Sequence, residues 1–354
     1  MAADAELNAD ILATVRCPTC RSALRPSANP VDDVMRLECP GCRARWPVRF
    51  GIPDLRPAGI EDPYLSRDDD LRAAERLFER AQTGGFPDAL AAYYETNEKV
   101  SAAQARQFIA GTMAAEERAR AVLATWRDWC GVPFAGDGAT LVDVGCGTGP
   151  LLVASHAPDV RLVGIDVGLR WLVLAAARLR DRGADALLVC AGAHRLPLAD
   201  AGVDVVASES LLENAPPAAG TIAEAHRVLR PGGWLCLTTA NRWSLGPDPH
   251  VGLPLGGWLP EGMVRAWATR RGMVPPRRRL LRAGDLERLI ASPAFEQRRI
   301  GPPPVTDAQR AGASPVIRAA IDAYRLVSRS VAGRAALVAV GPSLLAVARR
   351  TNAR

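Results

Sequence analysis

Four cysteines near the amino terminus have the spacing of a metal site. Cys17 and Cys20 form one Cys-x-x-Cys pair, Cys39 and Cys42 form another, and 18 residues separate the pairs. Two such turns place four thiolates tetrahedrally around Zn²⁺. Because four thiolates fill the coordination sphere, the ion is expected to be structural. A disulfide pair or a redox-active Cys-x-x-Cys is the alternative for these residues.

A glycine-rich turn forms a second candidate site. The segment 141–149 reads LVDVGCGTG, with Gly145, Cys146, Gly147 and Gly149 in the turn and Asp143 two residues before its first glycine. Glycines let the backbone approach a ligand closely, and a carboxylate can bind an amino group. A turn of this kind alone is also found in dinucleotide-binding proteins.

Further candidate ligand residues follow each of the next predicted strands. An acidic residue at the end of the second strand can accept hydrogen bonds from both hydroxyls of a ribose, and loops after the later strands should lie at the same edge of the sheet. The candidates are Asp166 and Val167, then Gly192, Ala193 and His194, and finally Ser208 and Glu209.

Short Val/Leu runs alternate with helical stretches over this part of the chain. This alternation is typical of an α/β protein with a doubly wound parallel sheet. The predicted strands are 140–144, 161–166, 186–190, 204–208 and 234–239, and the helices are 150–157, 169–182 and 217–229. Strands are also expected at 295–300 and 344–348, with a helical stretch at 316–338 between them.

Composition divides the chain into three predicted parts. Residues 11–57 hold the paired cysteines and many prolines, and residues 60–135 have helical periodicity at 71–81, 87–100 and 114–129. The first part is expected to be a zinc ribbon and the second a helical linker or lid. Residues 136–354 are expected to form the α/β domain, with a helical insertion at about 305–338.

Residues 136–240 resemble the class I S-adenosylmethionine-dependent methyltransferases. The glycine turn with Asp143, the acidic end of the second strand, the loop 191–198 and the turn 227–234 carry the resemblance. It implies a Rossmann-like fold and S-adenosylmethionine as cofactor. Gly192 departs from the family pattern, which often has an acidic residue for the adenine amino group. An NAD(P) oxidoreductase would need a longer G-x-G-x-x-G turn into its helix, which the chain lacks.

The cysteine segment has its own resemblance. Residues 11–55 are similar to Trm112-like zinc ribbons. The similarity includes the last five residues of this range, which begin with Gly51-Ile52-Pro53. Those small domains accompany or activate methyltransferases, so the resemblance implies a platform or substrate-gripping module. Loss of the metal is expected to destabilise this module without altering cofactor binding by the α/β domain.

Methyl transfer from a sulfonium depends mainly on alignment and exclusion of water, although an oxygen or nitrogen acceptor can need a base. Glu213 and His250, which follow the fourth and fifth strands, are the candidate bases.

Asn241, Arg242, His250 and Trp258 are expected to border an enclosed pocket if the acceptor is small. RNA is the alternative acceptor, in which case Arg277 to Arg282 and the ribbon should form one basic face. A cofactor-binding interaction protein without catalysis is the third alternative.

The charge distribution favours a small acceptor over RNA. The net charge is +6, yet 18 arginines and six acidic residues lie from Pro260 onward, which leaves the preceding part net acidic. A protein that binds RNA through its first two thirds would need the opposite balance. The oligomeric state stays open.

Two further features concern the cellular location. Cys130, Cys146, Cys190 and Cys236 stand singly among apolar residues, which favours buried thiols and a cytoplasmic location. The apolar run 331–348 is interrupted at Gly341-Pro342, so a helix followed by a strand is expected there instead of a membrane span.

Overall fold

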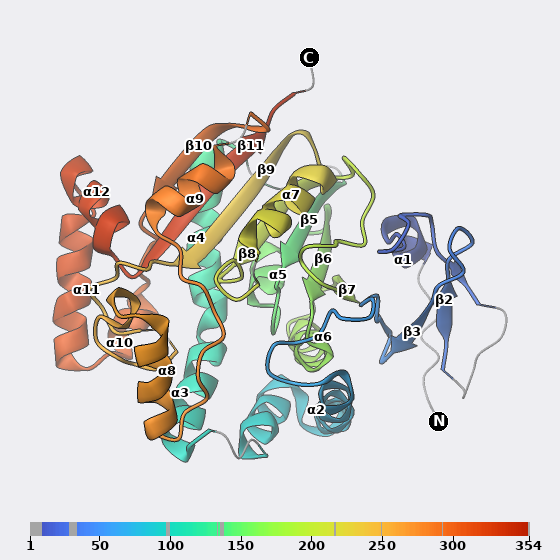
Figure 1. Ribbon diagram of the computed structural model, residues 1–354, viewed down its shortest axis with the longest axis horizontal. Coiled ribbons are helices and arrows are strands. Elements are labelled where there is room, and N and C mark those ends of the chain that lie inside the picture. Colours follow the sequence, from blue (N-terminus) through green and yellow to red (C-terminus); the bar gives the residue numbers. More distant parts are fainter. Residues whose placement is uncertain are drawn as a thin grey trace.

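The computed structural model describes residues 9–27, 34–96, 100–132, 134, 138–215, 217–248, 250–291 and 293–352. Its centre is a seven-stranded sheet with the order β10-β11-β9-β8-β5-β6-β7 (Figure 1). The strands are β5 (Ala139–Val144), β6 (Val160–Asp166), β7 (Leu187–Cys190), β8 (Val203–Glu209), β9 (Leu229–Ala240), β10 (Phe295–Gly301) and β11 (Ser343–Arg350). Neighbours from β7 to β9 pair in parallel, and β11 is antiparallel to both β9 and β10.

All seven predicted strands are therefore confirmed, with ends that differ by a few residues. The largest difference is at β9, which begins at Leu229 and includes the predicted turn 230–233. Gly232 has a φ of +77° within this segment, so the chain bends there as the glycine pair predicts. The register between β8 and β9 shifts at the same place, between Val203 and Val205.

Alternating strand residues belong to two hydrophobic cores, one on each face of the sheet. Leu141 and Leu162 pack with the helices of one face, whereas Val142 and Val163 belong to the core of the other face. This alternation follows from the period of two along a strand. The covering helices are α4 (Ala115–Cys130), α5 (Pro150–Ser155) and α6 (Leu169–Asp181) on the first face, and α7 (Ala218–Val228) and α9 (Ala283–Ile290) on the second.

The cysteine-bearing segment folds as a small antiparallel sheet at the β7 edge (Figure 1). It comprises α1 (Ala9–Thr14), β1 (Arg25–Pro26), β2 (Arg36–Glu38), β3 (Arg45–Arg49) and β4 (Ile52–Pro53). Val15, Leu37 and Leu55 are fully buried and belong to the same hydrophobic cluster as the second face of the large sheet. The small sheet thus shares a core with the α/β part of the chain.

The predicted linker is helical, with two differences from the expectation. Helix α2 (Arg67–Glu95) spans the first predicted helix, 71–81, and most of the second, 87–100, and it bends at Gly85, whose φ is +70° and ψ is −166°. It ends at Glu95, before the predicted end at Val100, which is not helical; residues 97–99 lie outside the described residues. Helix α3 (Ala102–Met113) was not expected, although Ser101 and Gln104 form a capping box at its start. The predicted boundary at 135/136 also lies outside the described residues.

The insertion before the last strand consists of α10 (Asp307–Ala311), α11 (Pro315–Val327) and α12 (Val331–Val340). The predicted helical stretch 316–338 is thus divided, and Ser330 caps the second half by accepting a hydrogen bond from the Gly333 amide. Helix α12 ends at Val340 and β11 follows, as expected for the apolar run 331–348. Among the described residues, no helix has the length and apolar character needed to cross a membrane. Between β9 and β10 lie the 3₁₀ turn η1 (Gly256–Trp258) and α8 (Glu261–Arg270).

Candidate active site and metal centre

The glycine turn joins the carboxyl end of β5 to α5 and has a left-handed backbone at all three of its glycines. Gly145, Gly147 and Gly149 have φ values of +77°, +50° and +74°. A Cβ on Gly145 would lie 2.8 Å from Leu211 Cδ1, whereas a Cβ on Gly147 would meet no atom within 4 Å. The backbone at Gly147 therefore borders open space, as a turn that must approach a ligand requires. Cys146 is buried in the core below this turn.

Asp166, at the end of β6, faces the glycine turn. One carboxylate oxygen accepts a hydrogen bond from the Gly147 amide at 3.0 Å, and the other accepts one from the Gly168 amide at 2.8 Å. Burial raises the pKa of Asp166 to about 6, although these two amides partly oppose the rise. The residue is half-buried, so the remaining lone pairs of its oxygens are available to hydroxyl donors of a ligand.

Two more carboxylates lie near Asp166. Asp143 is 2% exposed, and burial together with the charges of Glu209 and Asp166 raises its pKa well above the ordinary value. Glu209, at the end of β8, forms an ion pair with Arg118 at 3.7 Å, and burial raises its pKa as well. Because the charges of Glu209 and Asp166 both act on Asp143, this edge of the sheet is electrostatically suited to a cationic ligand.

The other predicted ligand residues occupy different environments. Ser208 is buried and its hydroxyl donates to the Val144 carbonyl at 2.8 Å, so it links β8 to β5. Val167 is half-buried, Ala193 is buried and His194 is exposed in the loop after β7. Gly192 lies against Ile60, because a Cβ on this glycine would be 2.8 Å from Ile60 Cγ2. Nothing in the sequence around position 60 signals this contact.

Asp166 should make cofactor binding depend on pH. We expect the affinity for S-adenosylhomocysteine, the demethylated cofactor, to fall by up to about tenfold per unit below pH 6, because the protonated carboxyl accepts ribose hydroxyls poorly. Asp166→Asn should bind more weakly at pH 7.5 and should lose much of this pH dependence. Titration calorimetry from pH 5 to 8 tests this, with the exposed Asp185→Asn as the matched control. Equal pH profiles for wild type and Asp166→Asn would contradict the role of Asp166.

The two candidate bases differ in their surroundings. Glu213 is 2% exposed, and its carboxylate accepts hydrogen bonds from the Thr239 hydroxyl at 2.7 Å and the Ala240 amide at 3.2 Å. These bonds hold the end of β9, so the structure gives Glu213 an architectural role. His250 is exposed in its loop, and its backbone amide donates to the Asp248 carboxylate at 3.0 Å. A base role for either residue stays a prediction.

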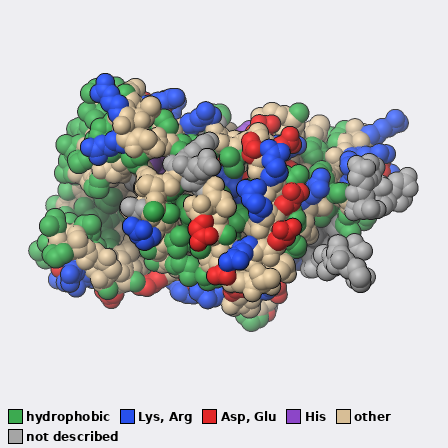
Figure 2. All heavy atoms as spheres, turned by 90° about the horizontal axis from the view of Figure 1, so that it is seen from below, with side chains coloured by type: hydrophobic (Ala, Val, Ile, Leu, Met, Phe, Trp, Pro, Cys, Tyr) green, Lys and Arg blue, Asp and Glu red, His purple; other side chains and the backbone are tan. Residues whose placement is uncertain are grey.

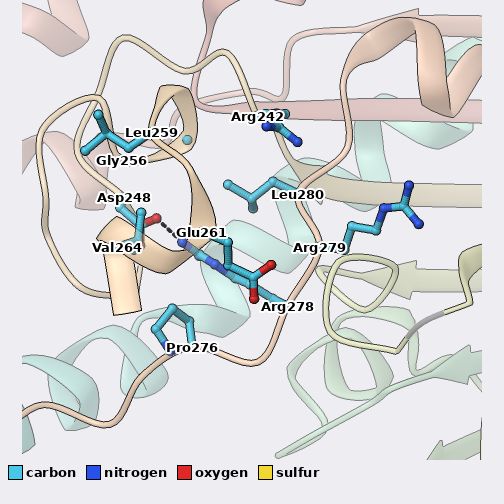
Figure 3. Close-up of a pocket in the computed structure, with 11 residues that line it drawn as sticks. Arg242, Asp248, Gly256, Leu259, Glu261, Val264, Pro276, Arg278, Arg279 and Leu280 are labelled. Atoms are coloured by element: carbon cyan, nitrogen blue, oxygen red, sulfur yellow. Dashed lines mark hydrogen bonds and ion pairs between the residues drawn. The ribbon is translucent and has the colours of Figure 1, made fainter. Parts of the chain in front are cut away.

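A cavity of about 80 Å³ opens beyond the carboxyl end of β9 (Figure 3). Arg278 crosses it and pairs with Asp248, and both side chains are buried. Of the four residues expected at an acceptor pocket, Arg242 is the one that lines this cavity within the described structure. The lining residues are Arg242, Asp248, Gly256, Gly257, Leu259, Glu261, Val264, Pro276, Arg278, Arg279 and Leu280.

Two of the remaining expected residues serve the local architecture instead. The Asn241 side chain is buried and donates to the carbonyls of Val338 and Ala339 at 3.1 and 3.2 Å, which ties the end of β9 to α12. The Trp258 indole donates to the Ser244 carbonyl at 3.1 Å, and its ring lies 4.6 Å from that of Trp243. The cavity is therefore lined mainly by other residues, which come from the segments 248–264 and 276–280, and an acceptor pocket bordered by Asn241, Arg242, His250 and Trp258 stays a prediction.

The four cysteines converge at one point of the ribbon. Their sulfur atoms all lie within 4.8 Å of one another, with Cys17 and Cys42 at 3.6 Å and Cys20 and Cys39 at 3.2 Å. A tetrahedral Zn²⁺ with bonds of about 2.3 Å separates its sulfur ligands by about 3.8 Å, so the cluster fits this ion. The Ser22 hydroxyl and amide lower the pKa of Cys20 to about 6, whereas burial raises the pKa of Cys39, so the positions of the sulfur atoms support the metal site and the thiol pKa values do not.

The two cysteine turns have the same backbone geometry. The residue after each pair, Arg21 or Arg43, is left-handed with a φ of +64° or +60°. Its amide donates to the carbonyl of the first cysteine of that pair, at 2.7 Å for Cys17 and 2.9 Å for Cys39. This repeated turn aims both sulfur pairs at a common centre.

The class of the α/β part follows from this fold and from comparison with known proteins. Residues 142–237 match a family described as "Methyltransferase domain". The strand order, the glycine turn and the two acidic strand ends lie in or beside this segment. Residues 142–237 therefore form a methyltransferase domain, within a sheet of the Rossmann-like type.

Several curated proteins resemble part of the chain. A ubiquinone biosynthesis O-methyltransferase of Thiobacillus denitrificans is 33% identical over 30% of this chain and 46% of its own length. A malonyl-[acyl-carrier protein] O-methyltransferase of Methylococcus capsulatus is 34% identical over 38% of this chain and 48% of its own. The chain thus spans about half the length of these curated relatives.

Solved structures also align with the chain. The phosphoethanolamine N-methyltransferase 2 of Haemonchus contortus, in complex with S-adenosyl-L-methionine, has a TM-score of 0.41 at 15% identity and covers 66% of this chain and 52% of its own. The [4+2]-cyclase SpnF has a TM-score of 0.46 at 20% identity, and the alignment covers 84% of this chain and 99% of the SpnF chain.

Proposed function

We propose that the protein is an S-adenosylmethionine-dependent methyltransferase that methylates an oxygen or nitrogen atom of a small molecule. The proposal rests on the juxtaposition of Asp143, Asp166 and the open backbone at Gly147 at the ends of adjacent strands. The names of the two curated relatives, both O-methyltransferases, favour an oxygen acceptor.

The residues present suit the parts of the cofactor. Asp143 would bind the ammonium of the methionine portion and Asp166 the ribose hydroxyls, while Gly192 and Ala193 would border the adenine. The bound cofactor supplies a methyl group on a positively charged sulfur. The chain would hold that sulfonium beside carboxylates, exclude water and align the acceptor, which are the main requirements of an in-line displacement.

The surface supports a small acceptor over RNA. Within the segment 277–282, Arg278 is buried against Asp248, and Arg282 pairs with Asp285 at 2.9 Å. Figure 2 shows basic and acidic side chains interspersed on the face seen from below. RNA binding needs a broad basic surface, which this segment does not supply.

A methyl-transfer assay tests the proposal. With S-adenosylmethionine labelled in its methyl group, we expect the label to enter a small hydroxylated or carboxylated acceptor from a panel of phenols, quinols and acyl thioesters. Ribosomal and transfer RNA should remain unlabelled, and RNA binding should be undetectable or insensitive to salt. Labelled RNA with steeply salt-dependent binding would overturn the small-molecule assignment, and cofactor binding without transfer to any acceptor class would indicate a non-catalytic protein.

We also propose that the ribbon is Trm112-like and binds one structural Zn²⁺ through its four cysteines. The sulfur distances and the two matched turns support this assignment. Cys146, Cys190 and Cys236 are buried free thiols, which argues for a reducing compartment such as the cytoplasm.

A further inference from the structure

The chain leaving the ribbon runs directly into the proposed cofactor site. The exit segment, residues 54–62, begins where β4 ends, and Asp54 forms a parallel bridge with Cys190 at the carboxyl end of β7. The Leu55 amide donates to the Cys190 carbonyl at 2.8 Å. The exit segment therefore extends the sheet at the edge where a class I domain binds its ligand.

Arg56 is the centre of the contacts made by this segment. Its side chain is 1% exposed and makes a bidentate pair with Asp54, with Nε–Oδ1 at 2.8 Å and Nη2–Oδ2 at 2.7 Å. Its Nη1 donates to Asp70 at 3.0 Å and to the Val167 carbonyl at 2.8 Å. Val167 directly follows Asp166, so a buried guanidinium fixes the backbone beside the proposed ribose carboxylate.

Asp70 extends this network to helix α6. Its buried carboxylate accepts hydrogen bonds from the backbone amides of Leu169 at 2.8 Å and Arg170 at 3.3 Å, which caps the start of α6 from a different helix. The Arg170 side chain in turn binds Asp70 at 2.8 Å and Asp62 at 3.0 Å. Both ends of the exit segment are thus attached to the turn between β6 and α6.

The middle of the exit segment reaches the other side of the site. Ile60 packs against Gly192, in the loop proposed to border the adenine. Arg67 holds this part of the segment, because its Nη2 donates to the carbonyls of Arg56 at 2.9 Å, Pro57 at 3.1 Å and Ile60 at 3.4 Å. The absence of a side chain at position 192 is what allows Ile60 to approach.

We propose that the exit segment is the wall of the cofactor site on its adenosine side. Ile60 contacts the purine, and Arg56 is a positioning residue that holds Asp166 through Val167 and Asp70. This inference rests on the proposed function, because it concerns the same cofactor. It also links the two parts of the chain, because an ordered ribbon favours cofactor binding. Bound cofactor must then stabilise the ordered, metal-loaded ribbon by the same free energy.

Two variants separate positioning from stability. Arg56→Met removes the centre of the network but leaves the buried Asp54 carboxylate without its arginine partner, which can destabilise the fold. Ile60→Ser removes the proposed contact with the purine and leaves the charged network intact. Arg45→Met is the matched control, since Arg45 is an exposed arginine of the same ribbon.

Calorimetric titration with S-adenosylhomocysteine, alongside thermal melting of each full-length variant, tests the wall. We expect affinity to fall about tenfold in Ile60→Ser, with an unchanged melting temperature, and at least as much in folded Arg56→Met. Arg45→Met should match wild type. Wild-type protein that binds no S-adenosylhomocysteine would refute the proposed function itself. Wild-type binding with unchanged affinity in Ile60→Ser would overturn the present inference alone.

Competition with a zinc chelator tests the linkage. At equilibrium with the chelator, measured with a colorimetric zinc indicator, we expect saturating S-adenosylhomocysteine to raise the apparent zinc affinity of the wild-type protein about tenfold, and to have little effect in Ile60→Ser. Equal apparent zinc affinities with and without the ligand, in protein shown to bind it, would contradict a link between the ribbon and the cofactor site.

Discussion

Gly145→Val is expected to abolish binding of S-adenosylhomocysteine. The backbone at this position has a φ of +77°, which a β-branched residue rarely adopts, and the added Cβ would lie 2.8 Å from Leu211 Cδ1. Strain and overlap together must displace the turn or Leu211, and the turn is the part that approaches the ligand. We expect an affinity loss of at least about 100-fold, equivalent to roughly 3 kcal/mol, by calorimetry.

Gly138→Val is the matched control for backbone strain. Gly138 has the same φ of +77° and immediately precedes β5, at the end of that strand opposite the glycine turn. A Cβ added at Gly138 would meet no atom within 4 Å. This variant should lose stability without a comparable loss of affinity. If the two variants lowered affinity equally, general strain would explain the effect and the close approach of the turn to the ligand would not.

Cys39→Ser is expected to have the second large effect, loss of the metal and of an ordered ribbon. Zinc binding contributes on the order of 10 kcal/mol to the folding of small zinc domains, and a serine hydroxyl is a poor replacement for a thiolate. We expect zinc content near zero by elemental analysis and a melting temperature lower by at least about 5 °C. The buried ribbon residues in the shared core, such as Leu37, explain why the whole protein should be affected.

Cys130→Ser provides the control, because Cys130 lies in α4, far along the chain from the ribbon. It should retain one zinc per chain. Cys39→Ser should also weaken cofactor binding, since the exit segment that follows the ribbon contacts Val167 and Cys190. This differs from the expectation that the two parts act separately. Wild-type protein that contains no zinc when purified without chelators would refute the metal assignment.

The sheet and the glycine turn were predictable because their signals are local. A buried parallel strand is a short run of Val and Leu, and the residues that follow it are fixed at the ligand-binding edge. Asp143 and Asp166 are therefore found by counting along the chain from the strands. The two cysteine turns are equally local, since each is held by bonds within six residues, as between Cys17 and Ser22.

The acceptor side and the exit segment could not be predicted in this way. Arg56 meets Val167 across 111 positions, and Ile60 meets Gly192 across an even longer separation, so no periodicity reports these contacts. Asn241 is expected at the pocket because it follows β9, yet it supports α12 through two hydrogen bonds. Helix α3 is a different case, because its capping box at Ser101 was a readable signal.

Titration of the full-length protein with S-adenosylhomocysteine, in parallel with NAD⁺, tests the cofactor assignment most directly. We expect one binding site per chain for S-adenosylhomocysteine, weakened by Asp166→Asn, and no measurable binding of NAD⁺. Absence of binding to folded, zinc-loaded wild-type protein, or tighter binding of NAD⁺, would contradict the assignment of the glycine turn and Asp166 to S-adenosylmethionine.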